Sequence, residues 1–303
     1  MSKPTYSIAV IGLGAMGMGA AKSCITKGLD TYGIDLNSKA LETLKSFGAT
    51  DIGENAIPFA SKLDAVLLLV VNATQVKSIL FGENGLAPHL NKGTVVMVSS
   101  TISAQDAKEI SHKLTELGLL MLLDAPVSGG AAKAANGDMT VMASGSKEAF
   151  EKLEPVLEAV AGKVYNIGEE IGLGATVKII HQLLAGVHIA AGAEAMALAA
   201  RAGIPLDLMY DVVTNAAGNS WMFENRMKHV VDGDYTPLSM VDIFVKDLGL
   251  VTDTAKALKF PLPLASTAFN MFTSASNAGY GKEDDSAVIK IFDGIELPKK
   301  GDK

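Results

Sequence analysis

The chain has 303 residues, of which 49% are hydrophobic and 19% are charged, and its formal net charge is -7. This composition excludes a largely disordered chain, and the negative charge disfavours a nucleic-acid or membrane-surface partner because each would need a basic face. The single cysteine, Cys24, leaves no intramolecular disulfide, and the five histidines include no HxH or HxxxH pair that would indicate a metal site. The longest apolar runs are broken by glycine, proline or charge, so we expect no membrane span. We expect a cytoplasmic protein of two domains, with Cys24 as a buried structural thiol.

A dinucleotide-binding pattern opens the chain. Residues 7–11 resemble a buried parallel strand, a glycine turn follows at 12–17, and a helical pattern then runs from 18 to 27. Asp35 ends a second short strand at the distance where this fold places its ribose-binding acid. Because a carboxylate accepts ribose hydroxyls and repels a 2′-phosphate, we predict NAD as the cofactor. The predicted cofactor residues here are Gly12, Leu13, Gly14, Ala15, Met16, Gly17 and Asp35. The alternative is a glycine-rich turn that binds nothing.

Strands and helices then alternate up to residue 168. The predicted strands span 65–71, 94–98, 119–124, 140–143 and 163–167, and the predicted helices span 40–47, 74–80, 103–117 and 147–160. Such repeated units predict an α/β domain over 1–168, a Rossmann fold with a doubly wound, mostly parallel sheet. The loops at the carboxyl ends of its strands should converge on the cofactor. They place Asn72 and Thr101 among the predicted cofactor residues, together with Val71 at the end of the preceding strand, although Ser100-Thr101 could simply cap a helix. Ser103 is the predicted N-cap of the helix at 103–117.

After residue 168 only helical patterns remain. They span 172–201, 207–215, 220–231, 240–257 and 264–278, and predict an all-α domain over 169–298, followed by a disordered tail at 299–303. The first of these helices is apolar on nearly every face, which predicts a helix buried all round. We expect a neighbouring subunit to contribute to that burial, and therefore a homo-oligomer. Asp284-Asp285 is expected to lie in a solvated loop.

Lys178 lies inside this apolar helix. A buried ammonium is costly unless it is paired or deprotonated, so such a lysine indicates a functional role. Gln182 lies on the same helix face and His181 lies beside it. Held near Lys246 or Lys133, Lys178 could lose its proton and act as a base. The alternative is a lysine that reaches solvent from the first turn of the helix.

Five motifs together resemble the β-hydroxyacid dehydrogenases and follow the order of that family. They are the glycine turn with Met16, Ser100-Thr101, the segment DAPVSGG at 124–130, GLGATVK at 172–178 and KDL at 246–248. The resemblance implies a Rossmann domain, a long interdomain helix and an all-α domain that pairs subunits. It also implies that Lys178 is the catalytic lysine and that Ser128, Gly129 and Gly130 bind the substrate carboxylate. Thr101 would lie by the nicotinamide, and Lys246 on the cofactor and substrate side.

One departure from the family pattern concerns the substrate. The family has two asparagines after the catalytic lysine, where this chain has His181 and Gln182. Gln182 could hold Lys178 or the substrate, and His181 or Asn219 could meet additional hydroxyls. This puts 3-hydroxyisobutyrate and tartronate semialdehyde in doubt as substrates, and the runs 178–188, 71–73 and 218–226 resemble a member of the family that oxidises a four-carbon sugar acid with NAD. The alternatives are an enzyme for those smaller substrates and an NAD-binding sensor without turnover. Trp221 fits either a core position or a pocket lid.

Overall fold

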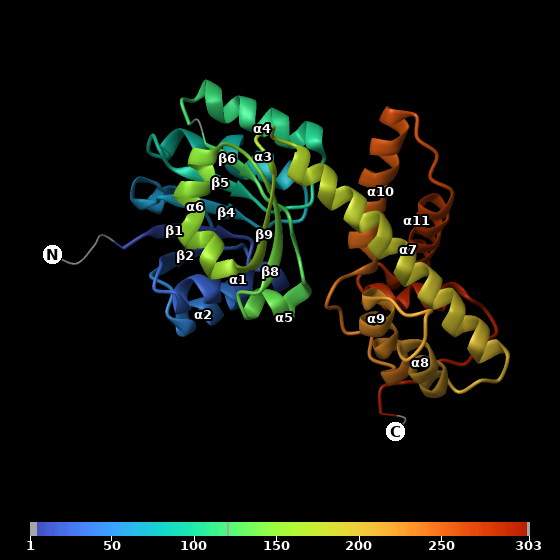
Figure 1. The fold of residues 1–303 in the computed structure, drawn as a ribbon. Helices are drawn as coiled ribbons and strands as arrows, with labels where there is room; N and C mark the ends of the chain where they lie inside the picture. Colours follow the sequence, from blue (N-terminus) through green and yellow to red (C-terminus); the bar gives the residue numbers. More distant parts are fainter. Residues whose placement is uncertain (1–4, 120, 302–303) are drawn as a thin grey trace. The chain divides into compact units, whose positions relative to one another are not determined.

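The computed structural model describes residues 5–119 and 121–301, which belong to two compact units (Figure 1). The units are Met1–Lys178 and Ile179–Lys303, so the division falls inside the longest helix, α7 (Leu173–Arg201), and not at residue 168. The first turns of α7 belong to the first unit because they are hydrogen-bonded to its sheet, as described below. The predicted tail at 299–303 is described as far as Gly301, and residues 302 and 303 lie outside the described residues. Within it, the Lys300 ammonium lies 2.8 Å from the Asp234 carboxylate.

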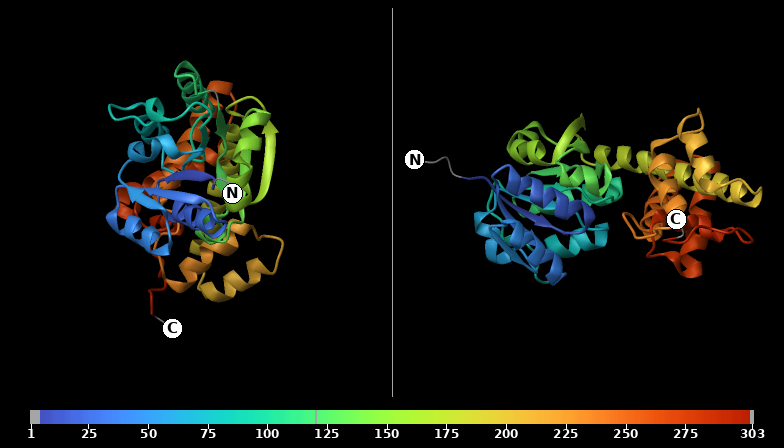
Figure 2. Two further views of the ribbon diagram at one scale, coloured as in Figure 1. Left: turned by 90° about the vertical axis from the view of Figure 1, so that its left-hand side faces the viewer. Right: turned by 90° about the horizontal axis from the view of Figure 1, so that it is seen from below.

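A sheet with helices around it forms the centre of the first unit (Figure 2). Its strand order is β3-β2-β1-β4-β5-β6-β8-β7, and β9 pairs with β8. Neighbouring strands from β3 to β6 are parallel, whereas β8 runs antiparallel to β6 and β7. The strands are β1 (Ser7–Ile11), β2 (Asp30–Ile34), β3 (Asp51–Gly53), β4 (Ala65–Leu68), β5 (Val95–Val98), β6 (Leu122–Asp124), β7 (Val127–Ser128), β8 (Met139–Ser144) and β9 (Ala161–Gly168). The predicted doubly wound, mostly parallel sheet is confirmed. The strand expected at 119–124 begins at Leu122, and residue 120 lies outside the described residues.

Helices cover both faces of this sheet, because the strand period of two sends alternate side chains to opposite sides. Ile8 and Val10 belong to one apolar core, and Ala9 and Ile11 to the other. The first core is closed by α1 (Ala15–Thr26), α2 (Ser38–Phe47), α5 (Gly130–Ala135) and α6 (Lys147–Val160). The second is closed by η1 (Ile57–Lys62), α3 (Ala73–Phe81), η2 (Ala87–His89) and α4 (Ala104–Glu116). Cys24 is buried in the first core, where burial raises the pKa of its thiol to about 12, as a structural thiol requires.

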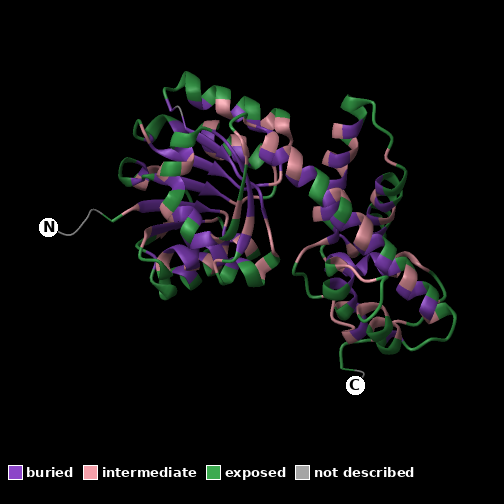
Figure 3. Ribbon diagram, viewed as in Figure 1, coloured by how far each residue is buried: buried purple, intermediate pink, exposed green. Residues whose placement is uncertain are grey.

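The second unit is all helical, as predicted. Its helices are the main part of α7 with α8 (Leu206–Thr214), α9 (Trp221–Asp232), α10 (Val241–Leu258), α11 (Pro263–Ala275), the π-helical turn η3 (Ser276–Tyr280) and the 3-10 helix η4 (Asp285–Ile291). Buried residues collect on the inner faces of these helices (Figure 3). The short η4 packs against α9, α10 and α11, and its residues Ala287, Val288 and Ile289 are fully buried. A helix of seven residues thus fills the middle of the bundle.

Asp284 and Asp285 are fully buried, so the expectation of a solvated loop is wrong. The Asp284 carboxylate accepts hydrogen bonds from the backbone and hydroxyl of Ser286, at 3.1 and 2.6 Å, and from the Leu238 amide at 3.1 Å. Asp285 lies 2.7 Å from the guanidinium of Arg226. Two adjacent acids can therefore be buried because each has partners that only the folded unit supplies.

The predicted all-round burial of α7 is also wrong within one chain. Ile180, Leu184 and Leu198 are 57%, 52% and 69% exposed, because the bundle covers α7 on one side only. Among the described residues, α7 alone is long and apolar enough to cross a membrane. That is weak evidence for a span, because half of its most apolar stretch is buried in the protein, as in the core helix of a globular bundle.

Candidate active site

The loops that carry the predicted cofactor residues meet at one edge of the sheet. The strands β1, β2, β4, β5 and β6 are parallel, so their carboxyl ends lie on the same side. β1 stands between β2 and β4, where the strand order reverses direction, and such switch points open the crevice that holds a dinucleotide. The residues directly after β1, β2 and β6 are Gly12, Asp35 and Ala125, and Val71 and Thr101 lie three residues after the ends of β4 and β5.

The glycine turn between β1 and α1 has the form that a pyrophosphate needs. Gly12 has φ 93°, and a Cβ on Gly17 would lie 1.7 Å from the Gly12 carbonyl oxygen, so the chain itself requires both glycines. A Cβ on Gly14 would meet nothing within 4 Å, which leaves this side of the turn open to a ligand. No side chain caps α1, although side chains cap α2, α3, α4 and α6. The first amides of α1 can therefore donate to phosphate oxygens.

Asp35 joins the end of β2 to this turn. Its carboxylate accepts hydrogen bonds from the backbone amides of Leu13 at 2.6 Å and Asn37 at 2.8 Å. Each carboxylate oxygen keeps a further lone pair for a ribose hydroxyl. Leu13 itself is buried, and its backbone amide makes the contact. Asp35 thus both orients the glycine turn and presents a negative charge where a 2′-phosphate would have to lie.

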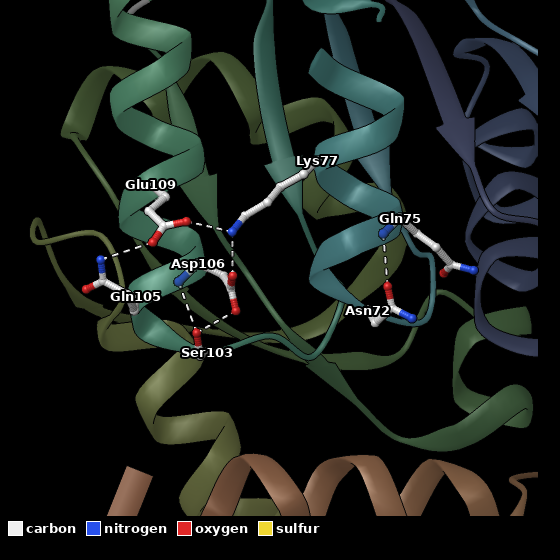
Figure 4. Close-up of polar contacts among 7 residues, drawn as sticks. All are labelled: Asn72, Gln75, Lys77, Ser103, Gln105, Asp106 and Glu109. Carbon is white, nitrogen blue, oxygen red and sulfur yellow. Dashed lines mark hydrogen bonds and ion pairs between the residues drawn. The ribbon is translucent and has the colours of Figure 1, made fainter. Parts of the chain in front are cut away.

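Val71 and Asn72 lie where β4 leads into α3, and their polar groups hold the start of that helix. The Asn72 side chain accepts a hydrogen bond from the Gln75 amide at 2.9 Å (Figure 4). The Val71 amide donates to the Gln75 side chain at 2.8 Å. Asn72 is therefore the N-cap of α3, whatever else it binds. The Val71 side chain is 45% exposed, which suits a residue that covers a cofactor ring.

Lys77 ties this helix to α4 (Figure 4). Its ammonium lies 2.7 Å from Asp106 and 2.6 Å from Glu109, and its hydrogen bond lowers the pKa of the Glu109 carboxyl. Ser103 caps α4, as predicted, by accepting from the Asp106 amide at 3.0 Å. The loop that carries Thr101 is thereby held relative to the loop after β4. The sequence gives no signal for this link, because Lys77 and its partners are about 30 residues apart.

The segment Ser128-Gly129-Gly130 forms an open backbone turn at the start of α5. Ser128 ends β7, and Gly129 and Gly130 have φ values of 133° and 72°, which other residues rarely adopt. A Cβ on Gly129 would come within 2.8 Å of the Lys133 side chain, whereas a Cβ on Gly130 would meet nothing within 4 Å. The N-cap residue of α5 is Gly129, which has no side chain to cap the helix, and backbone amides at such a turn suit a carboxylate.

Asp124 fastens the start of α7 to the sheet. At the end of β6, its Oδ2 accepts hydrogen bonds from the amides of Gly172 at 3.0 Å and Ala175 at 2.9 Å. The Ser144 hydroxyl donates to the same oxygen at 3.3 Å and accepts from the Gly174 amide at 3.0 Å. Burial raises the pKa of Asp124, and these hydrogen bonds oppose that rise. The amides of the first turn of α7 are therefore satisfied by the sheet.

Lys178 follows one turn later on the same helix and is 6% exposed. Its position is set by the Asp124 contacts and by the absence of a side chain at Gly174. A Cβ there would lie 2.5 Å from the Asp124 carbonyl oxygen, so only glycine lets α7 approach the sheet this closely. Asp124 belongs to the segment at 124–130 that resembles the family, but the sequence does not predict that it anchors the helix that carries Lys178.

A polar chain of four residues lies in the second unit. The Gln182 side-chain amide donates to Asp247 Oδ2 at 2.6 Å, and its oxygen lies 3.0 Å from His181 Nδ1. The Lys246 ammonium lies 2.7 Å from Asp247 Oδ1. Gln182 and Asp247 are 8% and 2% exposed. Because Asp247 is buried, Lys246 and Asp247 do not form the exposed ion pair expected on an isolated helix. Sequence reasoning named no role for Asp247, because nothing local relates it to Gln182.

Asn219 lies just before α9. Its side-chain nitrogen donates to the Glu224 carboxylate at 3.2 Å and to the Thr214 carbonyl at 3.4 Å. Trp221, two residues on, is 57% exposed and is therefore not a core residue of the unit. Ser220 caps α9 by accepting from the Phe223 amide. The structure thus places a half-buried Asn219 and an exposed Trp221 at the start of the same helix.

The parallel sheet with its switch point and the glycine turn have the form of a dinucleotide-binding domain. Residues 7–168 match the family model of the NAD binding domain of 6-phosphogluconate dehydrogenase, and residues 172–292 match that of the NAD-binding domain of NADP-dependent 3-hydroxyisobutyrate dehydrogenase. The chain belongs to the β-hydroxyacid dehydrogenase family.

Individual relatives match nearly the whole chain. The L-threonate dehydrogenase of Haemophilus influenzae is 77% identical over 301 residues, which cover 99% of this chain and 100% of that protein. The L-threonate dehydrogenase of Escherichia coli K12 is 76% identical over 293 residues, which cover 97% of each. The crystal structure of a 3-hydroxyisobutyrate dehydrogenase from Salmonella typhimurium is 69% identical, with a TM-score of 0.92, and covers 95% of this chain and 100% of that one.

Proposed function

We propose that the protein oxidises L-threonate to its oxo acid, 2-oxo-tetronate, with NAD. The observation that carries the catalytic part is Lys178, a lysine 6% exposed on a helix whose start is anchored to the sheet by Asp124. The substrate part is supported by relatives that bear the name L-threonate dehydrogenase and are 76 to 79% identical over nearly their full length.

In this proposal Lys178 is the general base. As a neutral amine, Lys178 accepts the proton of the substrate hydroxyl. Bound NAD supplies the acceptor for the hydride that leaves the same carbon. In the direction of carbonyl reduction, the Lys178 ammonium returns the proton. General bases of this kind contribute about 10²- to 10⁴-fold to the rate.

The remaining roles divide between the substrate and the cofactor. We assign the substrate carboxylate to the turn of Ser128, Gly129 and Gly130, because the N-cap position of α5 is a glycine without a capping side chain. Its further hydroxyls are assigned to His181 and Asn219, and Gln182 is assigned to hold His181. The cofactor is assigned to Gly12, Leu13, Gly14, Ala15, Met16, Gly17, Asp35, Val71, Asn72, Thr101 and Lys246. Thr101 stays a candidate for contact with both.

Two alternative functions have to be distinguished from this one. The structure that is 69% identical bears the name 3-hydroxyisobutyrate dehydrogenase, which keeps smaller hydroxy acids and tartronate semialdehyde in the comparison. A sensor that binds NAD without turnover is the second. A sensor has no use for a buried lysine on an anchored helix, so the Lys178 geometry favours an enzyme.

The test is NADH formation by the purified protein with NAD and a panel of L-threonate, D-threonate, D-erythronate, 3-hydroxyisobutyrate and D-glycerate. L-threonate should give the highest kcat/KM. Lys178→Ala should lose at least ~100-fold in kcat while still binding NAD. Lys256→Ala, on the exposed side of α10, is the matched control and should be unaffected. Binding of NAD without turnover of any panel member would favour the sensor.

We also propose that the protein is a cytoplasmic homo-oligomer. Ile180, Leu184 and Leu198 expose apolar surface along α7, and a second copy of the chain would remove it from water. Light scattering at micromolar concentration tests this, and a monomer would contradict it. Replacing Leu184 with Glu should shift an oligomer toward monomer.

A further inference from the structure

We propose that Gly19 and Ser23 of α1 are positioning residues for the substrate. They dock α5 directly onto the helix whose start is assigned to the cofactor, and so fix where the carboxylate turn of Ser128, Gly129 and Gly130 lies relative to that helix. Both are buried, so neither touches the substrate itself. This inference rests on the proposed function for what the turn and the start of α1 bind.

The carboxylate turn depends on its two ends for its position. Gly129 and Gly130 have φ values of 133° and 72°, and two successive glycines have many other conformations available. One end of the turn is the two-residue strand β7, which pairs with β8. The other end is α5, and a helix of six residues is not stable by itself. What α5 packs against therefore decides where this end of the turn lies.

The helix α5 packs against α1 (Figure 1). Of its six residues, all of which the structure describes, only Ala134 is buried. A Cβ on Gly19 would lie 2.6 Å from both the Ala134 carbonyl carbon and the Ala135 amide nitrogen. The backbone of α5 thus lies directly on α1, and only a residue without a side chain leaves room for it.

Ser23 supplies the polar part of this contact. It follows Gly19 by four residues, so the two lie on the same face of α1. The last carbonyl groups of a helix have no partner within the helix. That of Ala134 accepts a hydrogen bond from the Ser23 hydroxyl at 3.1 Å, in a buried contact, and another from the Gly137 amide at 3.3 Å. Ser23 therefore ties the C-terminal end of α5 to α1.

The contact lies close to the start of α1. Gly19 follows Gly14, the N-cap of α1, by five residues, so it lies about 7.5 Å along the helix. The amides assigned to the cofactor pyrophosphate and the contact that holds α5 are therefore within two turns of one helix. The two assigned binding turns are thus connected through a short and regular stretch of backbone.

A larger side chain at this contact should move α5 and not α1. Ala20, Ala21 and Cys24 are 0% exposed and hold α1 in the first core. Ordinary contacts of a Cβ begin at 3.4 Å, so a Cβ at position 19 requires the contact at 2.6 Å to lengthen by about 0.8 Å. The carboxylate turn would then be displaced together with α5.

Two substitutions test the contact kinetically. Gly19→Ala pushes α5 away from α1, and Ser23→Ala removes its hydrogen bond. The KM for L-threonate should rise about tenfold in Gly19→Ala and severalfold in Ser23→Ala, while kcat changes by less than about threefold, because the turn binds the carboxylate throughout the reaction. The NAD dissociation constant should stay within about twofold. Leu153→Ala, at a fully buried position of α6 in the same unit, should unfold at lower urea and yet keep the wild-type KM.

Hydrogen–deuterium exchange of the protein alone tests the docking without any substrate. The amides of Asn136, Gly137 and Asp138 donate to carbonyl groups of α5, so their exchange reports the opening of this end of the helix. In Ser23→Ala they should exchange about fivefold faster than in the wild type, the scale of one lost hydrogen bond. Ser46→Ala, which loses an exposed hydrogen bond from a hydroxyl to a carbonyl group of its own helix, is the matched control and should leave them unchanged.

Three results would overturn the proposal. The first is an unchanged KM for L-threonate in folded Ser23→Ala protein. The second is an equal rise in KM in Leu153→Ala, which would indicate a general loss of stability and not a positioning role. The third is unchanged exchange at residues 136–138 in Ser23→Ala. If the wild type does not oxidise L-threonate, the proposed function fails, whereas the exchange rates of the protein alone still decide whether Ser23 holds α5.

Discussion

Replacing Asp124 with Ala should both destabilise the first unit and slow catalysis. In the wild type, one carboxylate oxygen satisfies the amides of Gly172 and Ala175 and receives the Ser144 hydroxyl. Alanine leaves the two amides buried without this acceptor. Each unsatisfied buried amide costs about 1 to 3 kcal/mol, so the two together cost about 2 to 6 kcal/mol. Burial raises the pKa of the Asp124 carboxyl, so burying this carboxylate itself has a cost in the wild type. Alanine removes that cost, and the loss of unfolding free energy should therefore lie in the lower half of this range.

The loss in catalysis follows from where the anchor lies. Ala175 is one helical turn before Lys178, so a loosened first turn of α7 displaces the proposed base. The glycine turn and Asp35 lie on other loops, and NAD affinity should therefore change little. We expect kcat to fall about tenfold or more while the NAD dissociation constant stays within about twofold.

Urea unfolding followed by circular dichroism measures the first effect, and single-turnover kinetics with a separate NAD titration measures the second. The urea midpoint should fall by about 1 M or more, since m-values for such units are about 1 to 3 kcal/mol per M. Asp51→Asn, at an exposed ion pair with Lys45, is the control and should keep the wild-type midpoint. A folded Asp124→Ala protein with wild-type midpoint and kcat would refute the anchoring argument.

Three further predictions follow from the same contacts. Gly174→Ala should unfold at lower urea or fail to fold, because its Cβ would lie 2.5 Å from the Asp124 carbonyl oxygen, and circular dichroism measures this. Asp35→Ala should weaken NAD binding about tenfold and reduce the preference over NADP, measured by calorimetry. Asp285 has its pKa raised from 3.8 to about 7 by burial and by Asp284, against the opposing charge of Arg226. The folded protein therefore binds a proton at Asp285 more tightly than the unfolded chain does. The stability that this proton contributes is lost as pH rises from about 4 to about 7. Over that range the unfolding free energy of the wild type should fall relative to that of Asp285→Asn.

The parts of the fold that sequence reasoning predicts are those with local signals. The strand at 7–11, the helix at 147–160 and the Ser103 cap agree with the structure because a buried strand, a periodic helix and an N-cap each depend on neighbouring residues. The short strand β3 and the six-residue helix α5 escape prediction because three to six residues carry no clear period. Strand β4 ends at Leu68, although its apolar run continues to Val71.

The errors and omissions have a different cause. Asp284-Asp285 has the composition of a solvated loop, and its burial depends on partners that the folded unit supplies, among them the guanidinium of Arg226, the Leu238 amide and the cap of η4. Asp247 has no local relation to Gln182, which is 65 residues away, so its role depends on how α7 packs against α10. Sequence motifs predict the proposed site residues. The structure adds the backbone contacts that require particular glycines and the acidic side chains that hold the loops.

The last described residues of the chain have a practical consequence for work with this protein. They close over the end of the second unit: Lys300 pairs with Asp234, and a side chain on Gly233 would lie 2.6 Å from the Pro298 carbonyl oxygen. The guanidinium of Arg201, at the end of α7, donates to the Gly294 carbonyl at 2.6 Å. A purification tag or fusion partner joined to this end without a spacer would compete with those contacts, so protein for the assays above is better tagged at the other terminus or with a cleavable linker.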